Sequence, residues 1–476
     1  MFQATDPFFV FDEFRVPYAR DARNGRRGAW GELTWTGPGG PRTVLWPRMG
    51  GRDVDATEGE HRLGAIPVFG RIVRDDGLER RPPRGASVAG WDVVVTVTDR
   101  DGNAVGAIRR DPRGGLLLPF DPGELITNLR SERYRDIASP RLAVGALRRA
   151  RGLYYRARPL LPRAVQLGLR RRFTAVQQRL SFPRWPVETA LHDLCDLLFG
   201  LLAGVAGEPL PRIAAWPGER SWALVLTHDV ETEAGRRHVA LLRERELRHG
   251  VRSSWNFVPR RYDVTDDLVA GLLADGFEVG VHGLYHDGRD LASAALARRR
   301  LPQMHEYAAR WRATGFRSPA LNRDWALVRT IGFDYDSSYP DTDPYQPQPG
   351  GCCSWLPFFN GDVVELPVTL PQDHTLLEIL GRPEPAEWFD KAEALRRRGG
   401  MALLITHPDY MLDAGRLDAY DRFLARFAPD PAAWVALPRE VAGWWRRRAA
   451  SSIRRTPEGW AISGPAAEDG RVELVS

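Results

Sequence analysis

Cysteine and lysine are both scarce in this 476-residue sequence. Its three cysteines, Cys195, Cys352 and Cys353, are odd in number and two are adjacent, which argues against a disulfide framework and favours a reducing compartment. Lys391 is the only lysine, so arginine carries almost all of the positive charge. The net charge of +6 is spread along the chain and is not packed into a tail. The charge therefore gives no reason to expect a nucleic-acid partner.

Long apolar runs are also missing. No stretch approaches the roughly 18 uninterrupted apolar residues of a membrane-spanning helix, and the longest, Leu197–Ala206, is expected in a core helix. Residues Met1–Pro7 contain no basic segment followed by an apolar one, so we expect no signal peptide. These absences predict a cytoplasmic protein.

The length predicts two or three folding units, at roughly 100–200 residues each. Residues 1–135 are expected to be β-rich, with a hairpin formed by Trp91–Thr98 and Ala104–Ile108. Residues 136–214 are predicted to form an Arg-rich helical connecting region. Its basic amphipathic stretch Ala164–Phe173 predicts either a helix packed on its own protein or peripheral contact with the inner face of a membrane.

The pattern changes from about Ser221 onward. Short apolar runs such as Phe277–Val281 and Met401–Ile405 alternate with helical segments such as Asp266–Ala274 and Ala386–Arg398. Alternation of this kind is typical of an α/β fold with parallel strands covered by helices. We expect one catalytic domain over residues 215–450 and a tail over 451–476.

Polar residues follow four of the expected strands directly. Asp229 and Glu231 come after the first, and His282, Arg317 and His407 come after three others. Because functional groups in such folds gather where parallel strands end, these side chains are predicted to meet at one rim.

The His282–His286 spacing allows both imidazoles to reach one cation if the segment forms a helical turn. Two surface histidines on a helix would show the same spacing. In an extended segment Asp229 and Glu231 would point the same way, so one carboxylate could bind the metal and the other accept a proton. An acidic N-terminal cap for a helix near Arg236 is the simpler alternative for these carboxylates.

Five short motifs occur in a recognisable order. They are Thr227–Glu231, His282-x3-His286, Arg317-Ser318-Pro319, Asp336-Ser337-Ser338 and Leu403-x3-His407. Together they resemble the polysaccharide deacetylase (NodB-homology, carbohydrate esterase family 4) domain, over about half of the chain. The resemblance implies a (β/α)7-type barrel, with a separate β-rich and helical N-terminal region, that removes N- or O-acetyl groups from sugars.

The resemblance also implies a role for each matching residue. It makes Asp229 the general base and His407 the general acid, with Arg317 orienting the base. It places Asp336 near the acid, and the backbone N–H of Ala320 at the oxyanion. His282 and His286 match the metal-binding histidines.

Two positions depart from the usual pattern. The second carboxylate of the first motif is displaced from Val230 to Glu231, which resembles a D-x-E subgroup and makes Glu231 the expected third ligand. Ala320 stands where an aromatic residue is usual, which leaves the shape of the substrate open.

The sequence thus predicts a metal-dependent, most simply Zn²⁺-dependent, hydrolase for an N-acetylated polysaccharide or lipid-linked sugar precursor, as in exopolysaccharide biosynthesis. Two alternatives stay open: an amidohydrolase for a non-sugar amide such as a cyclic ureide, and a catalytically silent glycan-binding module. His374 either lines the pocket or is structural, and the sequence leaves the oligomeric state undetermined.

Overall fold

The computed structural model describes residues 1–4, 6–20, 29–37, 39–48, 55–80, 83, 87–138, 168, 174, 177 and 181–476. The chain divides into two compact units. Unit 1 consists of Met1–Leu147, Thr189–Ala214 and Arg447–Ser476, and unit 2 of Arg148–Glu188 and Ala215–Arg446. The basic stretch 164–173, apart from residue 168, lies outside the described residues. No helix in the described part of the chain combines the length and apolarity needed to cross a bilayer.

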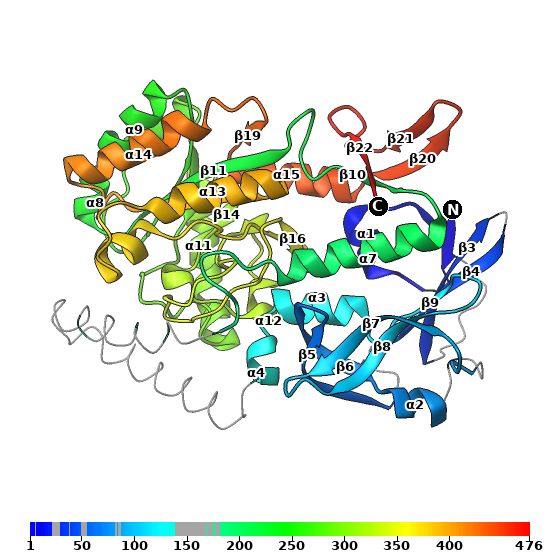
Figure 1. Ribbon diagram of the computed structural model, residues 1–476. Coiled ribbons are helices and arrows are strands. Elements are labelled where there is room, and N and C mark those ends of the chain that lie inside the picture. Colours follow the sequence, from blue (N-terminus) through cyan, green and yellow to red (C-terminus); the bar gives the residue numbers. More distant parts are fainter. Residues whose placement is uncertain are drawn as a thin grey trace. The chain divides into compact units, whose positions relative to one another are not determined.

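Unit 1 is β-rich, as predicted. Nine of its described strands form a mixed sheet in the order β2-β1-β3-β4-β9-β8-β7-β5-β6 (Figure 1). The strands are β1 (Phe2–Ala4), β2 (Tyr18–Arg20), β3 (Trp30–Gly37), β4 (Gly40–Pro47), β5 (Ala56–Leu63), β6 (Ile66–Val73), β7 (Asp92–Asp99), β8 (Ala104–Arg110) and β9 (Leu116–Leu117). The helices are α1 (Phe9–Phe14), α2 (Asp75–Arg80), α3 (Pro122–Arg130), α4 (Tyr134–Ala138) and α7 (Ala190–Ala206). The predicted hairpin corresponds to β7 and β8, which pair antiparallel.

The end of the chain belongs to unit 1. Strands β20 (Ser452–Thr456) and β21 (Gly459–Ser463) form a hairpin, and β22 (Val472–Val475) pairs antiparallel with β10 (Leu210–Ile213). The buried Arg448 side chain donates hydrogen bonds to the backbone oxygens of Ile213 and Glu13. Parts of unit 1 that precede unit 2 in the sequence are therefore bonded to parts that follow it, more than 200 residues later.

Unit 2 contains the parallel sheet. In the described residues, seven strands run parallel to their neighbours in the order β17-β15-β14-β13-β12-β11-β18, which confirms the predicted barrel-type α/β fold. The strands are β11 (Trp222–Val230), β12 (Ser254–Phe257), β13 (Glu278–Val281), β14 (Gly315–Phe316), β15 (Tyr335–Asp336), β17 (Val363–Glu365) and β18 (Met401–Thr406). Strand β16 (Phe358–Asn360) pairs antiparallel with β17, and β19 (Ala433–Val435) lies beside β11.

The segment after β17 connects the two ends of this sheet. The backbone N–H of Leu366 donates to Asp336, that of Val368 to Tyr339, and that of Leu370 to Leu403 in β18. This segment therefore forms hydrogen bonds first with β15 and the residues after it, and then with β18 at the other end of the sheet. The strands consequently surround a core.

Helices cover the outside of the strands (Figure 1). They are α8 (Glu233–Arg237), α9 (Val239–Arg248), α10 (Asp266–Ala274), α11 (Ala294–Trp311), α12 (Trp325–Val328), α13 (Ala386–Arg398), α14 (Ala414–Phe427) and α15 (Pro438–Ala449). Helices α10 and α11 pack against β13, and α13 packs against β11 and β18. The side chains of Thr265, Ser293 and Asp413 accept backbone N–H groups at the starts of α10, α11 and α14, and Gly399 in the left-handed conformation ends α13.

One buried ion pair lies inside unit 2. Lys391 of α13, 1% exposed, places its Nζ 2.8 Å from the carboxylate of Asp341. Burial raises the pKa of Asp341 to about 7, although the Lys391 ammonium favours its charged form. A buried pair of this kind contributes little net stability, but each partner depends on the other.

Candidate functional site

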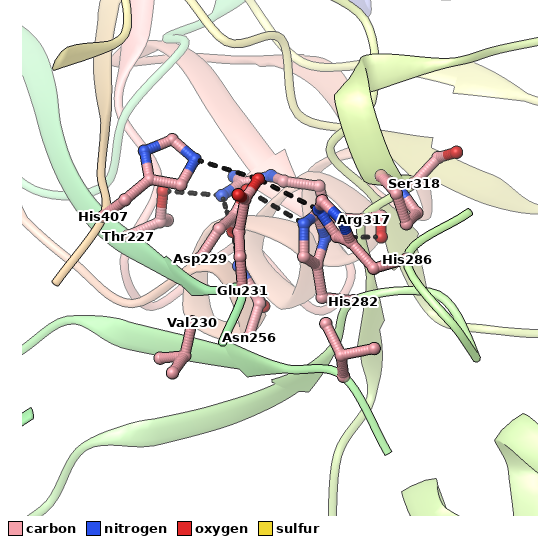
Figure 2. Close-up of polar contacts among 12 residues, drawn as sticks. Thr227, Asp229, Val230, Glu231, Asn256, His282, His286, Arg317, Ser318 and His407 are labelled. Carbon is pink, nitrogen blue, oxygen red and sulfur yellow. Dashed lines mark hydrogen bonds and ion pairs between the residues drawn. The ribbon is translucent and has the colours of Figure 1, made fainter. Parts of the chain in front are cut away.

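Ionisable side chains from four strands meet at one rim of unit 2 (Figure 2). Asp229 is the penultimate residue of β11, while His282, Arg317 and His407 directly follow β13, β14 and β18. The four strands run parallel, so their carboxyl ends lie at the same edge. Figure 2 shows His407 on one side, the two imidazoles of His282 and His286 on the other, and Glu231 and Asp229 between them.

Glu231, His282 and His286 form a group that could hold a metal ion. One oxygen of Glu231 and one ring nitrogen of each histidine all lie within 4.8 Å of one another. His286 Nε2 lies 2.9 Å from Glu231 Oε1. The three side chains thus converge on one point, as the resemblance predicts for the ligands.

The two histidines lie on a loop and not on the expected helical turn. Gly283 and His286 both have positive φ angles, 63° and 56°, which no helix contains. A Cβ on Gly283 would lie only 2.6 Å from Pro319, so a glycine is required by space as well as by conformation. The kinked loop brings the ring centroids of His282 and His286 to 5.0 Å.

The protonation of His282 suits a metal ligand. Its Nδ1 lies 3.1 Å from the backbone oxygen of Arg317, to which it can only donate, so the neutral ring keeps a lone pair on Nε2. Burial lowers the pKa of His282 to about 4, so the ring is neutral near pH 7. Nε2 is buried and has no hydrogen-bond partner among the described residues. A buried acceptor in this position is what a cation would satisfy.

His286 is held in a different way. Its Nδ1 lies 2.5 Å from Nη1 of Arg261, and because arginine can only donate, Nδ1 is the acceptor. The neutral ring then carries its hydrogen on Nε2, near Glu231 but outside hydrogen-bond geometry. A cation at Nε2 would need the ring hydrogen on Nδ1, so binding would require Arg261 to move away from Nδ1. Two imidazoles and one carboxylate fit the ligand set of a catalytic zinc site.

Asp229 is fixed as a carboxylate. Its Oδ1 accepts hydrogen bonds from Arg317 and from Asn256 of β12, each at 2.9 Å. Burial opposes its ionisation, but the Arg317 guanidinium and the neighbouring histidines outweigh burial and lower the pKa of Asp229. Its Oδ2 lies 3.8 Å from His282 Nε2, on the side of the metal-binding group.

Arg317 is itself held rigidly. Its guanidinium is 1% exposed and donates to the backbone oxygen and the hydroxyl of Ser337 as well as to Thr227 and Asp229. Every donor group is thus directed by the strand ends around it. The arginine consequently fixes the position of the Asp229 carboxylate as well as its charge.

His407 forms a buried pair with Asp373. His407 Nδ1 lies 2.6 Å from Asp373 Oδ1, and Asp373 Oδ2 accepts the backbone N–H of His407, also at 2.6 Å. Burial lowers the pKa of His407, but Asp373 and the carboxylates of Glu231 and Asp229 more than offset it and raise the pKa to about 10. The ring is therefore protonated at neutral pH, and its Nε2 lies 3.9 Å from Glu231 Oε1.

Asp336 occupies another position. It ends β15 opposite Glu365 of β17, and both side chains are fully buried. Its Oδ1 accepts the Ser338 hydroxyl at 2.6 Å, and Ser338 also accepts the backbone N–H of Ser318. Burial raises the pKa of both carboxyls, and the neighbouring Asp336 raises that of Glu365 further. Asp336 is expected near the acid, but the carboxylate that contacts His407 is Asp373, and Asp336 supports the turn behind Arg317 through Ser338.

Three further residues at the rim were not singled out from the sequence. Besides Asp373, these are Asp409 and Tyr410, which follow His407 closely in the chain. Asp409 Oδ2 accepts the backbone N–H of Glu231 at 3.0 Å, and the Tyr410 hydroxyl donates to Glu231 Oε2 at 3.2 Å. Their proximity to His407 was the available signal. His374, half-buried, places its ring centroid 5.0 Å from that of Tyr410, with the two rings tilted by 37°.

The turn after Arg317 has an unusual backbone. Ala320 and Leu321 both adopt positive φ angles, 55° and 48°, after Pro319. Left-handed non-glycine residues each cost on the order of 1–3 kcal/mol and tend to occur at functional sites. This is the segment in which the backbone N–H of Ala320 is expected to face the oxyanion.

A second polar network lies behind β11. Glu246 of α9, fully buried, accepts the hydroxyls of Tyr420 at 2.6 Å and Ser253 at 2.7 Å, and its Oε1 lies 2.8 Å from His228 Nε2. His228 Nδ1 lies 2.7 Å from the Thr406 hydroxyl. The network joins α9, α14, β11 and β18, so the histidine beside Asp229 has a structural role.

Among known proteins, similarity to this chain is found in solved structures and not in family models or curated sequences. No protein-family model matches the chain, and no curated protein matches its sequence. A protein assigned as a polysaccharide deacetylase in Mycobacterium smegmatis is 22% identical, with a TM-score of 0.41 and coverage of 48% of this chain and 92% of that one. One from Pseudomonas aeruginosa PAO1 is 18% identical, with a TM-score of 0.40 and coverage of 52% and 97%. Puue allantoinase is 15% identical, with a TM-score of 0.41 and coverage of 56% and 98%.

Proposed function

We propose that unit 2 is a metal-dependent hydrolase that removes acetyl groups from an N- or O-acetylated glycan. One observation carries this proposal: an ionised Asp229, a protonated His407 and the Glu231–His282–His286 group lie together at one strand-end rim. A base, an acid and a ligand set are the three elements that metal-assisted amide hydrolysis requires.

Glu231, His282 and His286 would hold the cation, for which Zn²⁺ is the simplest choice given two nitrogen ligands and one oxygen. When bound there, it would supply Lewis-acid polarisation of the acetyl carbonyl and lower the pKa of a coordinated water toward about 7. The backbone oxygen of Arg317 holds the outer nitrogen of His282 and so orients that ring.

Asp229 is proposed as the general base. Its Oδ1 is occupied by Arg317 and Asn256, so Oδ2 is the oxygen left to accept the proton of the attacking water. A lowered pKa makes this carboxylate a weak base, which suits a water that is already acidified. The water oxygen bonds to the acetyl carbon, and the backbone N–H of Ala320 is proposed to donate to the developing oxyanion.

His407 is proposed as the general acid. The Asp373 carboxylate keeps its ring protonated, and Nε2 faces the rim. As the bond between the acetyl carbon and the sugar nitrogen or oxygen breaks, Nε2–H donates its proton to the leaving atom, and acetate is released. An amine leaves poorly without this proton.

The decisive experiment measures metal and acetate together. Purified protein loaded with Zn²⁺ is assayed for bound metal by mass spectrometry and for acetate release from a panel of N-acetylated oligosaccharides. His282→Ala should lose the metal and lower the rate more than about 100-fold. His249→Ala is the matched control, because His249, directly after α9, is a partly exposed histidine paired with Asp421 of α14.

Each outcome selects one function. Bound metal with acetate release supports the deacetylase. Bound metal without acetate release, together with hydrolysis of a cyclic ureide, supports a non-sugar amidohydrolase. Glycan binding with neither metal nor hydrolysis supports a silent binding module. Full activity in His282→Ala would contradict the proposed ligand set.

A further inference from the structure

An exposed aromatic residue directly precedes one of the proposed ligands in the chain. Tyr285 precedes His286 in the chain and is 41% exposed. It is the only aromatic among the large hydrophobic side chains found exposed in the described part of the chain; the others are Met1, Val93, Val94, Leu412 and Leu474. A single exposed aliphatic residue is ordinary at a protein surface, but an exposed aromatic ring next in the chain to a proposed ligand calls for another explanation.

The ring of Tyr285 is supported from one side. The guanidinium carbon of Arg300, on α11, lies 5.0 Å from its centroid. Arg300 is buried and cannot swing away easily, because it makes two hydrogen bonds to Asp287, at 2.7 and 2.6 Å, and one to Asp290 at 2.8 Å. The stacked guanidinium restricts the orientation of the exposed ring.

The backbone under Tyr285 is restricted as well. Leu284 is fully buried, its N–H donates to Asp290, and its oxygen accepts the N–H of Arg260. Gly283 and His286, which flank Leu284 and Tyr285 in the chain, have positive φ angles. The loop that carries the ring therefore has little conformational freedom. A ligand that stacks on the ring would cost the protein little further conformational entropy.

We propose that Tyr285 is a sugar-stacking residue whose ring face opposite Arg300 binds a pyranose ring of the glycan next to the acetylated sugar. This inference rests on the proposed function and specifies its substrate as an oligomer. An aromatic face presents a flat apolar surface that suits the C–H groups on one face of a sugar ring. Tyr285 acts in binding and specificity and has no part in the proton transfers.

The experiment compares a long and a short substrate. The Zn²⁺-loaded protein is assayed with an N-acetylglucosamine tetramer and with 4-nitrophenyl acetate, which is too small to reach beyond the reacting acetyl group. Tyr285→Ala should raise the KM for the tetramer about tenfold, corresponding to about 1.4 kcal/mol, with kcat changed less than about twofold. The kcat/KM ratio of tetramer to ester should fall about tenfold.

Two other substitutions separate stacking from general apolarity. Tyr285→Phe keeps the ring and should retain the tetramer KM, whereas Tyr285→Leu keeps apolar surface without a flat face and should behave like Tyr285→Ala. Val93→Ala, in β7 of unit 1, is the control for truncating an exposed apolar side chain. Thermal melting of each variant checks folding, and Tyr285→Leu still carries the test if Tyr285→Ala does not fold.

Direct binding keeps this inference distinct from the proposed function. Calorimetry with the tetramer, on the wild type and Tyr285→Leu, reports stacking whether or not acetate is released. Tetramer binding that weakens in Tyr285→Leu without any hydrolysis would remove the deacetylase and keep the sugar-stacking residue. Acetate release with equal tetramer KM in the wild type, Tyr285→Leu and Tyr285→Ala would overturn the stacking residue and keep the deacetylase.

Discussion

Replacing Asp373 with asparagine should move the alkaline limit of the hydrolase to lower pH. Asp373 lies 2.6 Å from His407 Nδ1, and its charge keeps the proposed general acid protonated. Its effect has a definite sign. The pKa of His407 is about 6.5 in the unfolded chain and about 10 in the folded protein. The charged ring therefore contributes its full stabilisation below about pH 6.5, and this contribution is lost as the pH rises through about 10. Removing the carboxylate lowers the upper value.

The size of the change follows from the pKa. The pKa of His407 is raised from 6.5 to about 10, a difference of 3.5 pH units, and Asp373 contributes more to this rise than any other group. If Asp373 supplies about half of the difference, the limit falls to about pH 8 in the variant. At pH 9 the acid is then about 90% protonated in the wild type and about 10% in the variant, so the rate differs roughly tenfold. Near pH 6.5 the two rates converge.

The assay is acetate release by the Zn²⁺-loaded enzyme from pH 6 to 10.5. Asp373 also accepts the backbone N–H groups of His374 and His407, so asparagine leaves one donor badly paired and should cost about 1–3 kcal/mol of stability. Thermal melting at each pH therefore accompanies the rates. Asp413→Asn, at the exposed cap of α14, is the control. An unchanged alkaline limit in folded Asp373→Asn would refute His407 as the acid.

Two further predictions concern the buried charges. Lys391→Met should lower the free energy of unfolding by about 3–5 kcal/mol, because Asp341 is left buried without its partner. Adding Asp341→Asn should recover most of that loss. Urea unfolding of the single and double variants measures both free energies, and additive losses would contradict the pairing. Glu246→Gln should cost about 1–3 kcal/mol, since its network loses a charged acceptor, with metal content unchanged by mass spectrometry; a parallel loss of metal would show that the network of His228 and Tyr420 reaches the site.

Local signals in the sequence predicted much of unit 2. Helices Asp266–Ala274 and Ala386–Arg398 occur at the predicted residues because a capping Thr265 and a left-handed Gly399 mark their ends. The helix expected near Arg236 is instead interrupted at His238, between α8 and α9. Pairing of β10 with β22 could not be predicted, since no local pattern links strands more than 250 residues apart.

The same division holds at the rim. Asp229, His282, Arg317 and His407 could be placed together because each ends an apolar run, and parallel strands align their ends. Asp373 escaped notice because it follows an irregular segment and is identified by a contact with a residue 34 positions away. The placement of Asp336 opposite Glu365 likewise depends on the register of β15 and β17, which composition does not encode.

The buried Lys391 gives this chain a natural probe of its own opening. Lys391 carries the only side-chain amine of the chain, and in the folded protein its Nζ is covered and engaged by Asp341. Acylated Lys391, detected by peptide mass spectrometry, would therefore accumulate as the core of unit 2 opens transiently. The rate of its appearance would report how often that core becomes exposed, with and without added Zn²⁺, in the unaltered protein.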